Sequence, residues 1–230
     1  MRFLFLLITA LFLTGNSQAE TITDKHNNRT FKVEDIEGWK FLINEEILKS
    51  DNWPVAKRII SNQLFGMKLF LKDEVIKDMQ KVKIYVDIKQ KGKSGAEYHP
   101  SKKWLVDNGF SPEKAKCIEI SSIDQYLRYV KYQPFVMLHE LIHSYHDQVL
   151  GFENKEVLEC YEKAMKAGKY GEVLHIKSKK VKHYSSTNHK EYLSEAAEAY
   201  FGTNDYFPFV RAEILEYDPD ICKFLQKLAR

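Results

Sequence analysis

The sequence predicts an α+β domain in which a small mixed sheet precedes a central helix and a mostly helical C-terminal part. Segments in which apolar and polar residues alternate lie before residue 134, whereas segments with helical spacing of apolar residues dominate after residue 150. Between them lies a stretch with the motif His-Glu-Leu-Ile-His at residues 139–143. This order of elements is the basis of the predicted fold class.

The N-terminal segment differs from the rest of the chain. Arg2 is followed by an apolar run at residues 3–13, and the small residues Ser17 and Ala19 precede Glu20 at the −3 and −1 positions of a cut. This pattern is typical of a secretory signal peptide, and the run is only about half of the roughly 20 residues that span a bilayer. We therefore expect residues 1–19 to be a signal peptide that is removed after Ala19, and the protein to be secreted or periplasmic.

Charge and composition describe residues 20–230 as a single globular domain. The 35 basic and 32 acidic residues are spread evenly along the chain, which gives no basic patch for nucleic acid or for an anionic membrane. We expect a monomer with no nucleic-acid partner and no membrane contact after signal cleavage. For Cys117, Cys160 and Cys222 two interpretations stay open, one disulfide with one thiol left over or three buried thiols.

Before the motif, alternation and punctuation predict short strands and helices. Residues 20–29 are polar and predict a loose leader, and Glu37-Gly38 predicts a hairpin turn. The apolar residues that follow Pro54 repeat at helical spacing, although Gly66 interrupts them. The predicted elements are strands at 31–33, 39–43, 82–88 and 117–120, an extended segment at 96–99, a basic loop at 89–95, and helices after 54, at 104–109 and at 121–132.

After the motif, glycines mark the ends of most predicted elements. Gly168 and Gly202 each follow a run of helical periodicity, and Asp218-Pro219 opens another. A basic turn separates two short apolar segments, which predicts a hairpin. The predicted elements are helices at 155–167, at 189–201 and from 218 onward, and a hairpin of residues 173–176 with 181–184.

The motif at residues 139–143 has the spacing of a zinc site. Residues four apart lie above one another on a helix, so His139 and His143 can reach one metal ion, with Glu140 as general base. Pro134 suits the first helical position, and Gly151 suits the position just past the helix end. The alternative interpretation is a buried helix with two core histidines.

A third ligand is expected downstream of the motif. The metzincin pattern would need a histidine where Val149 stands, and is excluded. Glu191, Glu195 and Glu198 share one helical face, so we expect Glu191 to bind Zn²⁺ and Glu195 to brace a ligating imidazole. The alternative is a solvated acidic face in which Asn188 and Glu191 cap the helix.

Two spacings resemble a known family. Tyr184 lies seven residues before Glu191, and residues 191–196 read Glu-aromatic-x-x-Glu-Ala. Together with the motif at 139–143 this resembles the catalytic domain of anthrax lethal factor and the related Pro-Pro endopeptidases. Residues 97–100 and 204–209 also look like a family of small exported metallopeptidases.

The resemblance covers residues 133–202 and implies a zincin fold of the gluzincin type. It implies zinc ligands His139, His143 and Glu191, the base Glu140, and Tyr184 as a phenol that stabilises the oxyanion. A hydroxyl aimed at a developing oxyanion lowers the barrier by a few kcal/mol, which agrees with that role for Tyr184. The alternative for Tyr184 is a tyrosine at a strand end, packed on the core.

We therefore expect an exported zinc metalloendopeptidase that hydrolyses peptide bonds of a peptide or protein substrate by a zinc-bound water, with Glu140 as base. Residues 96–99 are the candidate edge strand for the substrate. The alternative is a non-catalytic zincin-like binding module with a structural metal, and a toxin-like peptidase is a third possibility.

Further polar residues near the motif have no assigned ligand role. His146 is expected to be structural or on the substrate side, and Asp147 either orients a ligand or is solvated. Residues 89–95 and 206–209 either line a substrate cleft or belong to surface and core. Four further histidines lack ligand spacing and are expected to be exposed or satisfied in the core: His99, His175, His183 and His189.

Overall fold

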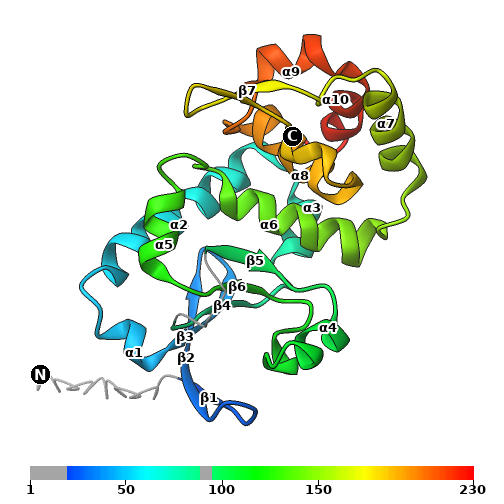
Figure 1. Ribbon diagram of the computed structural model, residues 1–230. Helices are drawn as coiled ribbons and strands as arrows, with labels where there is room; N and C mark the ends of the chain where they lie inside the picture. Colours follow the sequence, from blue (N-terminus) through cyan, green and yellow to red (C-terminus); the bar gives the residue numbers. More distant parts are fainter. Residues whose placement is uncertain (1–19, 89–94) are drawn as a thin grey trace, which may run out of the picture.

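The computed structural model describes residues 20–88 and 95–230, and it has the α+β class that the sequence predicts (Figure 1). The signal-peptide prediction for residues 1–19 and most of the predicted loop at 89–95 lie outside the described residues. Among the described residues, no helix is long and apolar enough to cross a membrane. All three cysteines are free thiols, with Cys160 partly buried and Cys117 and Cys222 buried.

The main sheet has six strands in the order β1-β2-β3-β4-β6-β5, so β5 is an edge strand. The β1-β2-β3 and β5-β6 pairs are antiparallel, whereas β4 pairs in parallel with β3 and β6. The strands are β1 (Thr21–Asp24), β2 (Arg29–Ile36), β3 (Trp39–Asn44), β4 (Ile84–Val86), β5 (Ala96–Tyr98) and β6 (Ile118–Ile120).

The predicted hairpin around Glu37-Gly38 is confirmed: it is formed by β2 and β3, with both turn residues at positive φ. The prediction of a loose leader at residues 20–29 was wrong. Residues 21–24 form β1, because Ile22 lies directly opposite Phe31 and packs on it at the outer face of the sheet. A single apolar side chain among polar neighbours gave too little alternation to reveal this strand.

The two faces of the sheet differ in chemistry. Phe41, Ile84 and Ile118 face the main core, where they meet the apolar sides of the helices. The opposite face carries a small apolar cluster around Tyr85 and a buried charged network around Lys114, which contacts Asp87 and Glu119. The helices that carry the candidate site, described below, pack on the apolar face of the sheet.

Helices α1 to α6 precede residue 146. Helix α2 (Trp53–Phe70) runs unbroken through Gly66. A side chain at this position would meet nothing within 4 Å, so the glycine lies at an open surface. The third helix, of seven residues, was not predicted. They are α1 (Glu45–Leu48), α2 (Trp53–Phe70), α3 (Asp73–Met79), α4 (Lys102–Asp107), α5 (Ile123–Tyr129) and α6 (Val136–Tyr145), with a 3-10 turn η1 (Pro112–Lys114).

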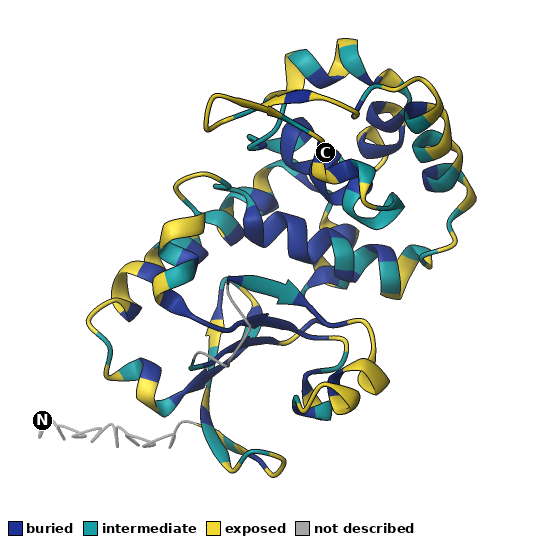
Figure 2. Cartoon of the chain, viewed as in Figure 1, coloured by how far each residue is buried: buried dark blue, intermediate teal, exposed yellow. Residues whose placement is uncertain are grey.

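Helix α6 is the most buried helix beside the sheet, and it lies between the sheet and the C-terminal helices (Figure 2). It begins at Val136, so the prediction that Pro134 takes the first helical position was wrong; the Pro134 carbonyl instead accepts a hydrogen bond from Gln63. The helix continues as a π-helical turn, η2 (His146–Leu150), which ends at Gly151 with a φ of 77°.

The C-terminal part is mostly helical and lies above α6 in Figure 1. The predicted second hairpin strand at 181–184 was misplaced, because the turn comes earlier, with Ser178 at positive φ. The final segment also contains an unpredicted helix, α9. The elements are α7 (Lys155–Lys166), β7 (Val173–His175), β8 (Lys179–Val181), a 3-10 turn η3 (Tyr184–Ser186), α8 (His189–Phe201), α9 (Arg211–Tyr217) and α10 (Pro219–Gln226).

Candidate metal centre

Helix α6 presents His139 and His143 on one side. The neighbouring residues Leu138, Leu141 and Ile142 are buried in the core, which fixes the rotation of the helix. Because the two histidines are four residues apart, their rings project in the same direction, with ring centroids 4.7 Å apart. The helix thus supplies two imidazoles to one point in space.

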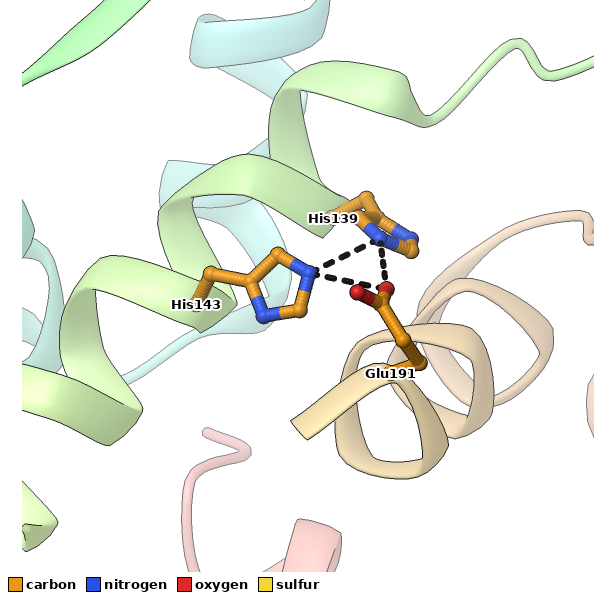
Figure 3. A group of neighbouring side chains, drawn as sticks. All are labelled: His139, His143 and Glu191. Carbon is orange, nitrogen blue, oxygen red and sulfur yellow. Dashed lines mark hydrogen bonds and ion pairs between the residues drawn. The ribbon is translucent and has the colours of Figure 1, made fainter. Parts of the chain in front are cut away.

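Helix α8 supplies the carboxylate that meets these imidazoles. Asn188 caps the helix, because its Oδ1 accepts hydrogen bonds from the backbone N–H groups of Lys190 and Glu191 at 2.9 and 3.0 Å. The first turn is therefore ordered where Glu191 leaves it. Glu191 points back across the gap between the helices toward α6 (Figure 3). The cap by Asn188 was expected under the alternative interpretation, but the solvated acidic face was not found, because Glu195 and Glu198 are buried.

Three atoms form a nearly equilateral triangle. Nε2 of His139 lies 3.1 Å from Nε2 of His143, and Oε2 of Glu191 lies 3.1 and 3.0 Å from these two nitrogens. A tetrahedral zinc ion with bonds of about 2.0–2.2 Å holds its ligands roughly 3.3–3.6 Å apart. The three atoms thus lie a few tenths of an ångström closer together than zinc ligands do, and two nitrogens with one oxygen are a donor set that zinc accepts.

The charges of these groups reinforce one another. Although burial disfavours the charged imidazolium, contacts with Glu191 and Glu198 raise the pKa of His139 well above its usual value. Burial also opposes ionisation of Glu191, but hydrogen bonds from both histidines bring its pKa far below the usual range. Burial lowers the pKa of His143. At neutral pH the triangle thus contains an ionised Glu191 carboxylate, a neutral His143 imidazole and a charged His139 imidazolium, which would have to release its proton to bind a cation.

A second carboxylate lies behind His139. Nδ1 of His139 is 2.6 Å from Oε1 of Glu198 and 3.6 Å from Oε1 of Glu195. The bracing role expected of Glu195 therefore falls geometrically to Glu198, one turn further along α8. Glu195 is drawn aside by Asn204, whose side-chain amide donates to it at 2.9 Å, while Gln133 donates to Glu198 at 2.8 Å.

The surroundings of these two glutamates are dry. Burial raises the pKa of both Glu195 and Glu198, and Oε2 of Glu198 lies buried without a hydrogen-bond partner in the described structure. His139, Glu195 and Glu198 also lie close enough together to hold an ion. In that second group His139 would bind the ion through Nδ1, whereas in the first group it uses Nε2. We therefore interpret Glu195 and Glu198 as carboxylates that support His139 in the first group.

Glu140 is held by the edge strand. Its Oε2 accepts a hydrogen bond of 2.7 Å from the backbone N–H of Tyr98 in β5. Burial raises the pKa of Glu140 to about 8. A carboxyl group with a pKa near the working pH is suited to accept and return a proton.

Tyr184 lies in the 3-10 turn η3, where a strand end was expected. Nδ1 of His183 accepts a hydrogen bond of 3.0 Å from the N–H of Ser185 and so caps this turn. The Tyr184 side chain is 46% exposed, which argues against the alternative of a tyrosine packed on the core. Burial of its inner part raises its pKa, so its hydroxyl is protonated at neutral pH.

One cavity of about 560 Å³ joins these groups. Its lining residues come mainly from β5, α6, η3 and α8, and from the segment that follows α8. The candidate residues that line it are Glu140, Tyr184, His139, His143, Glu191 and Glu195, and the further lining residues are Gly95, Ala96, Glu97, Tyr98, Tyr129, Gln133, Val136, Asp205 and Tyr206.

The other polar residues singled out from the sequence lie outside the triangle. His146 is fully buried, and neither ring nitrogen has a hydrogen-bond partner in the described structure. Asp147 accepts a hydrogen bond from Tyr98 and pairs with Lys116, and its side chain is mostly buried, so the prediction of a solvated carboxylate was wrong. Three of the four other histidines have polar contacts: His99 with Glu119, His175 with Asp205, and His183 with the N–H of Ser185 in η3. His189 packs against Tyr161, but its Nε2 is buried without a hydrogen-bond partner in the described structure, so the prediction that it is exposed or satisfied was wrong.

Sequence reasoning missed Tyr98 and the contact between His139 and Glu198. The face shared by Glu191 and Glu198 was visible in the sequence, but the choice between two carboxylates on one face depends on Asn204, which lies beyond the helix. Comparisons of the chain with protein-family models, with curated proteins and with solved structures find no match.

Proposed function

We propose that the protein is a zinc-dependent metallopeptidase, with His139, His143 and Glu191 as the residues that hold the ion. The observation that carries this proposal is the triangle of two imidazole nitrogens and one carboxylate oxygen at 3.0–3.1 Å. Three protein ligands with one side open to a cavity are typical of catalytic zinc sites, whereas structural sites have four protein ligands. The cavity beside the triangle supports a catalytic site.

A bound zinc ion supplies Lewis-acid chemistry, because it polarises a carbonyl group and makes water acidic near neutral pH. The residues of the chain supply the rest. The Glu140 carboxylate takes a proton from the attacking water and later gives it to the nitrogen of the leaving amine. Tyr184 donates its hydroxyl hydrogen to the oxygen of the scissile carbonyl as negative charge develops on it.

A peptide substrate fits the edge strand that borders the cavity. Ala96 and Tyr98 occupy positions of β5 whose backbone groups point away from β6, because antiparallel pairs alternate and the flanking bonds run from His99 to Cys117 and from Ser121 to Gly95. An extended peptide can therefore pair with the free edge at Ala96. This arrangement delivers a backbone carbonyl to the groups on α6.

The zincin fold of the gluzincin type is part of the same proposal. An antiparallel edge strand beside a buried helix with the two histidines, followed by a later helix with a candidate glutamate ligand, supports it. The signal-peptide pattern of residues 1–19 supports export, and the single core that includes both the sheet and α10 supports one domain from 20 to 230.

Reconstitution with metal tests the proposal. The protein is stripped with a chelator, and zinc content and cleavage of a mixed peptide pool are measured before and after zinc is returned. We expect one equivalent of zinc and cleavage that appears only with it. A zinc-loaded protein that cleaves no peptide would favour the alternative, a binding module in which the metal stabilises the fold.

A further inference from the structure

Tyr98 joins the edge strand to helix α6 at two points. Its backbone N–H donates to Oε2 of Glu140 at 2.7 Å, and its hydroxyl donates to Oδ2 of Asp147, also at 2.7 Å. Glu140 and Asp147 are seven residues apart, which corresponds to about 10 Å along a helix axis. One residue of β5 therefore spans two turns of the helix that carries the candidate metal ligands.

The strand geometry explains both contacts. Tyr98 lies directly opposite Ile118 on β6, and directly opposite residues place their side chains on the same face. Ile118 faces the core beside α6, so the Tyr98 ring does too, which lets its hydroxyl reach the end of the helix. The backbone N–H of Tyr98 points away from β6, toward the cavity, where the Glu140 carboxylate accepts it.

The π-helical turn at the end of α6 completes the contact. In this wider turn the consecutive residues Asp147 and Gln148 both reach the Tyr98 hydroxyl, the second through its side-chain amide at 3.1 Å. The same amide donates to the backbone carbonyl of Lys116 at 3.3 Å, and the Lys116 ammonium pairs with Asp147. π-helical turns are rare and often occur at functional sites.

We propose that Tyr98 is a positioning residue for Glu140, with Asp147 and Gln148 as the groups that hold it. The hydroxyl contacts fix the ring, the ring fixes the β5 backbone, and the backbone N–H fixes one oxygen of the Glu140 carboxylate. This inference rests on the proposed role of Glu140 as a base, but the contact between strand and helix can be measured without any activity.

The variant Tyr98→Phe removes the hydroxyl and keeps the ring. Its matched control is Tyr126→Phe, because Tyr126 is also a buried tyrosine and its hydroxyl donates to Gln63 at 3.0 Å, away from β5. The exchange rate of the Tyr98 amide hydrogen is measured by NMR in both variants. Tyr98→Phe loses the hydrogen bond from the hydroxyl to the charged Asp147 carboxylate, so we expect the Tyr98 amide hydrogen to exchange about tenfold faster. We expect Tyr126→Phe to leave this exchange rate unchanged.

Kinetics separate a positioning role from a packing role. With equal zinc content, Tyr98→Phe is expected to lower kcat about tenfold and to change KM less than twofold, because the substrate still meets the same edge at Ala96. Asp147→Asn keeps an acceptor for the hydroxyl and should retain more kcat than Asp147→Ala. Lys116→Gln removes only the ion pair and should resemble the unsubstituted protein.

A double-substitution cycle makes the inference independent of cleavage. If Glu140 and Tyr98 share one contact, Glu140→Ala and Tyr98→Phe together accelerate exchange of the Tyr98 amide little more than Glu140→Ala alone. Multiplicative effects of the two substitutions, or an exchange rate unchanged by Tyr98→Phe, would overturn the inference. Accelerated exchange with unchanged kcat would also overturn it. A protein that cleaves nothing but shows the coupled exchange would sink the proposed function and leave the contact intact.

Discussion

Nδ1 of His139 lies 2.6 Å from Oε1 of Glu198, while Nε2 of the same ring faces Glu191 at 3.1 Å. The imidazole is thus held between two carboxylates of one helix, seven residues apart. A carboxylate on the far nitrogen of a ligating histidine sets its tautomer and makes it a stronger metal ligand. Helix α8 thus supplies both Glu191, a candidate ligand, and Glu198, which contacts the far nitrogen of His139, another candidate ligand.

Glu198→Gln should therefore weaken zinc binding by about 10–100-fold, as loss of such a partner usually does. The matched control is Glu195→Gln on the same helix face, which should have a smaller effect because Glu195 lies 3.6 Å from Nδ1. Competition with a fluorescent zinc chelator measures both affinities. A larger loss in Glu195→Gln than in Glu198→Gln would contradict this assignment.

Removal of a ligand should be more severe. His143→Ala takes one corner from the triangle and should reduce zinc affinity by more than about 100-fold, beyond the range expected for an indirect partner. His26→Ala, at an exposed histidine of the β1–β2 turn, should bind zinc as before. Zinc content after dialysis, measured by mass spectrometry, distinguishes them. Equal zinc content in both variants would exclude His143 as a ligand.

Tyr184→Phe should lower kcat and spare binding. Loss of a donor to a developing oxyanion typically costs about 100–1,000-fold in kcat, and the partial exposure of Tyr184 favours the lower end of that range. KM and zinc content should change little, because the hydroxyl acts as charge develops. Steady-state kinetics on a cleaved peptide provide the measurement, and a rise in KM with kcat unchanged would assign Tyr184 to substrate binding.

Stability at low pH should depend on Glu119. Burial opposes its ionisation, but hydrogen bonding to His99 and the charge of Lys114 lower its pKa from 4.5 to about 2. Because the unfolded chain binds the proton more readily, this carboxylate stabilises the fold above about pH 4.5 and stops doing so as pH falls through about 2. The contribution is at most about 3 kcal/mol.

Urea unfolding between pH 7 and pH 2 tests this dependence. The unfolding free energy of the unsubstituted protein should fall more steeply below pH 4.5 than that of Glu119→Gln. Glu113→Gln, at an exposed carboxyl of the same segment, should follow the unsubstituted protein. Parallel curves for all three proteins would show that the buried network around Lys114 does not stabilise the fold through Glu119.

The helices of the candidate site were predictable because their signals are local. Asn188 at the start and Gly202 after the end bound α8 where the sequence indicated, and the spacing of His139 and His143 indicated that both rings lie on one side of α6. Both helices have strong local punctuation or periodicity. Their mutual position needed only one assumption, that a metal ion joins them.

The remaining features depend on contacts between distant residues. Strand β1 forms because Ile22 packs against Phe31 on the neighbouring strand. The hydrogen bond from Tyr98 to Asp147 likewise connects residues 49 positions apart. The choice of Glu198 over Glu195 depends on Asn204, which follows the helix. No local pattern contains this information, so the sequence alone indicated the face of α8 that carries these carboxylates but not which of them lies nearest to Nδ1 of His139.

Cleavage of a peptide library by the zinc-loaded protein, compared with its Glu140→Gln variant and analysed by mass spectrometry, tests the central claim most directly. The proposed function predicts cleavage by the unsubstituted protein and a loss of about 100–10,000-fold in Glu140→Gln at equal zinc content, as expected when a general base is removed. Equal cleavage by both zinc-loaded proteins would contradict the role of Glu140. Absence of cleavage by both would contradict the peptidase.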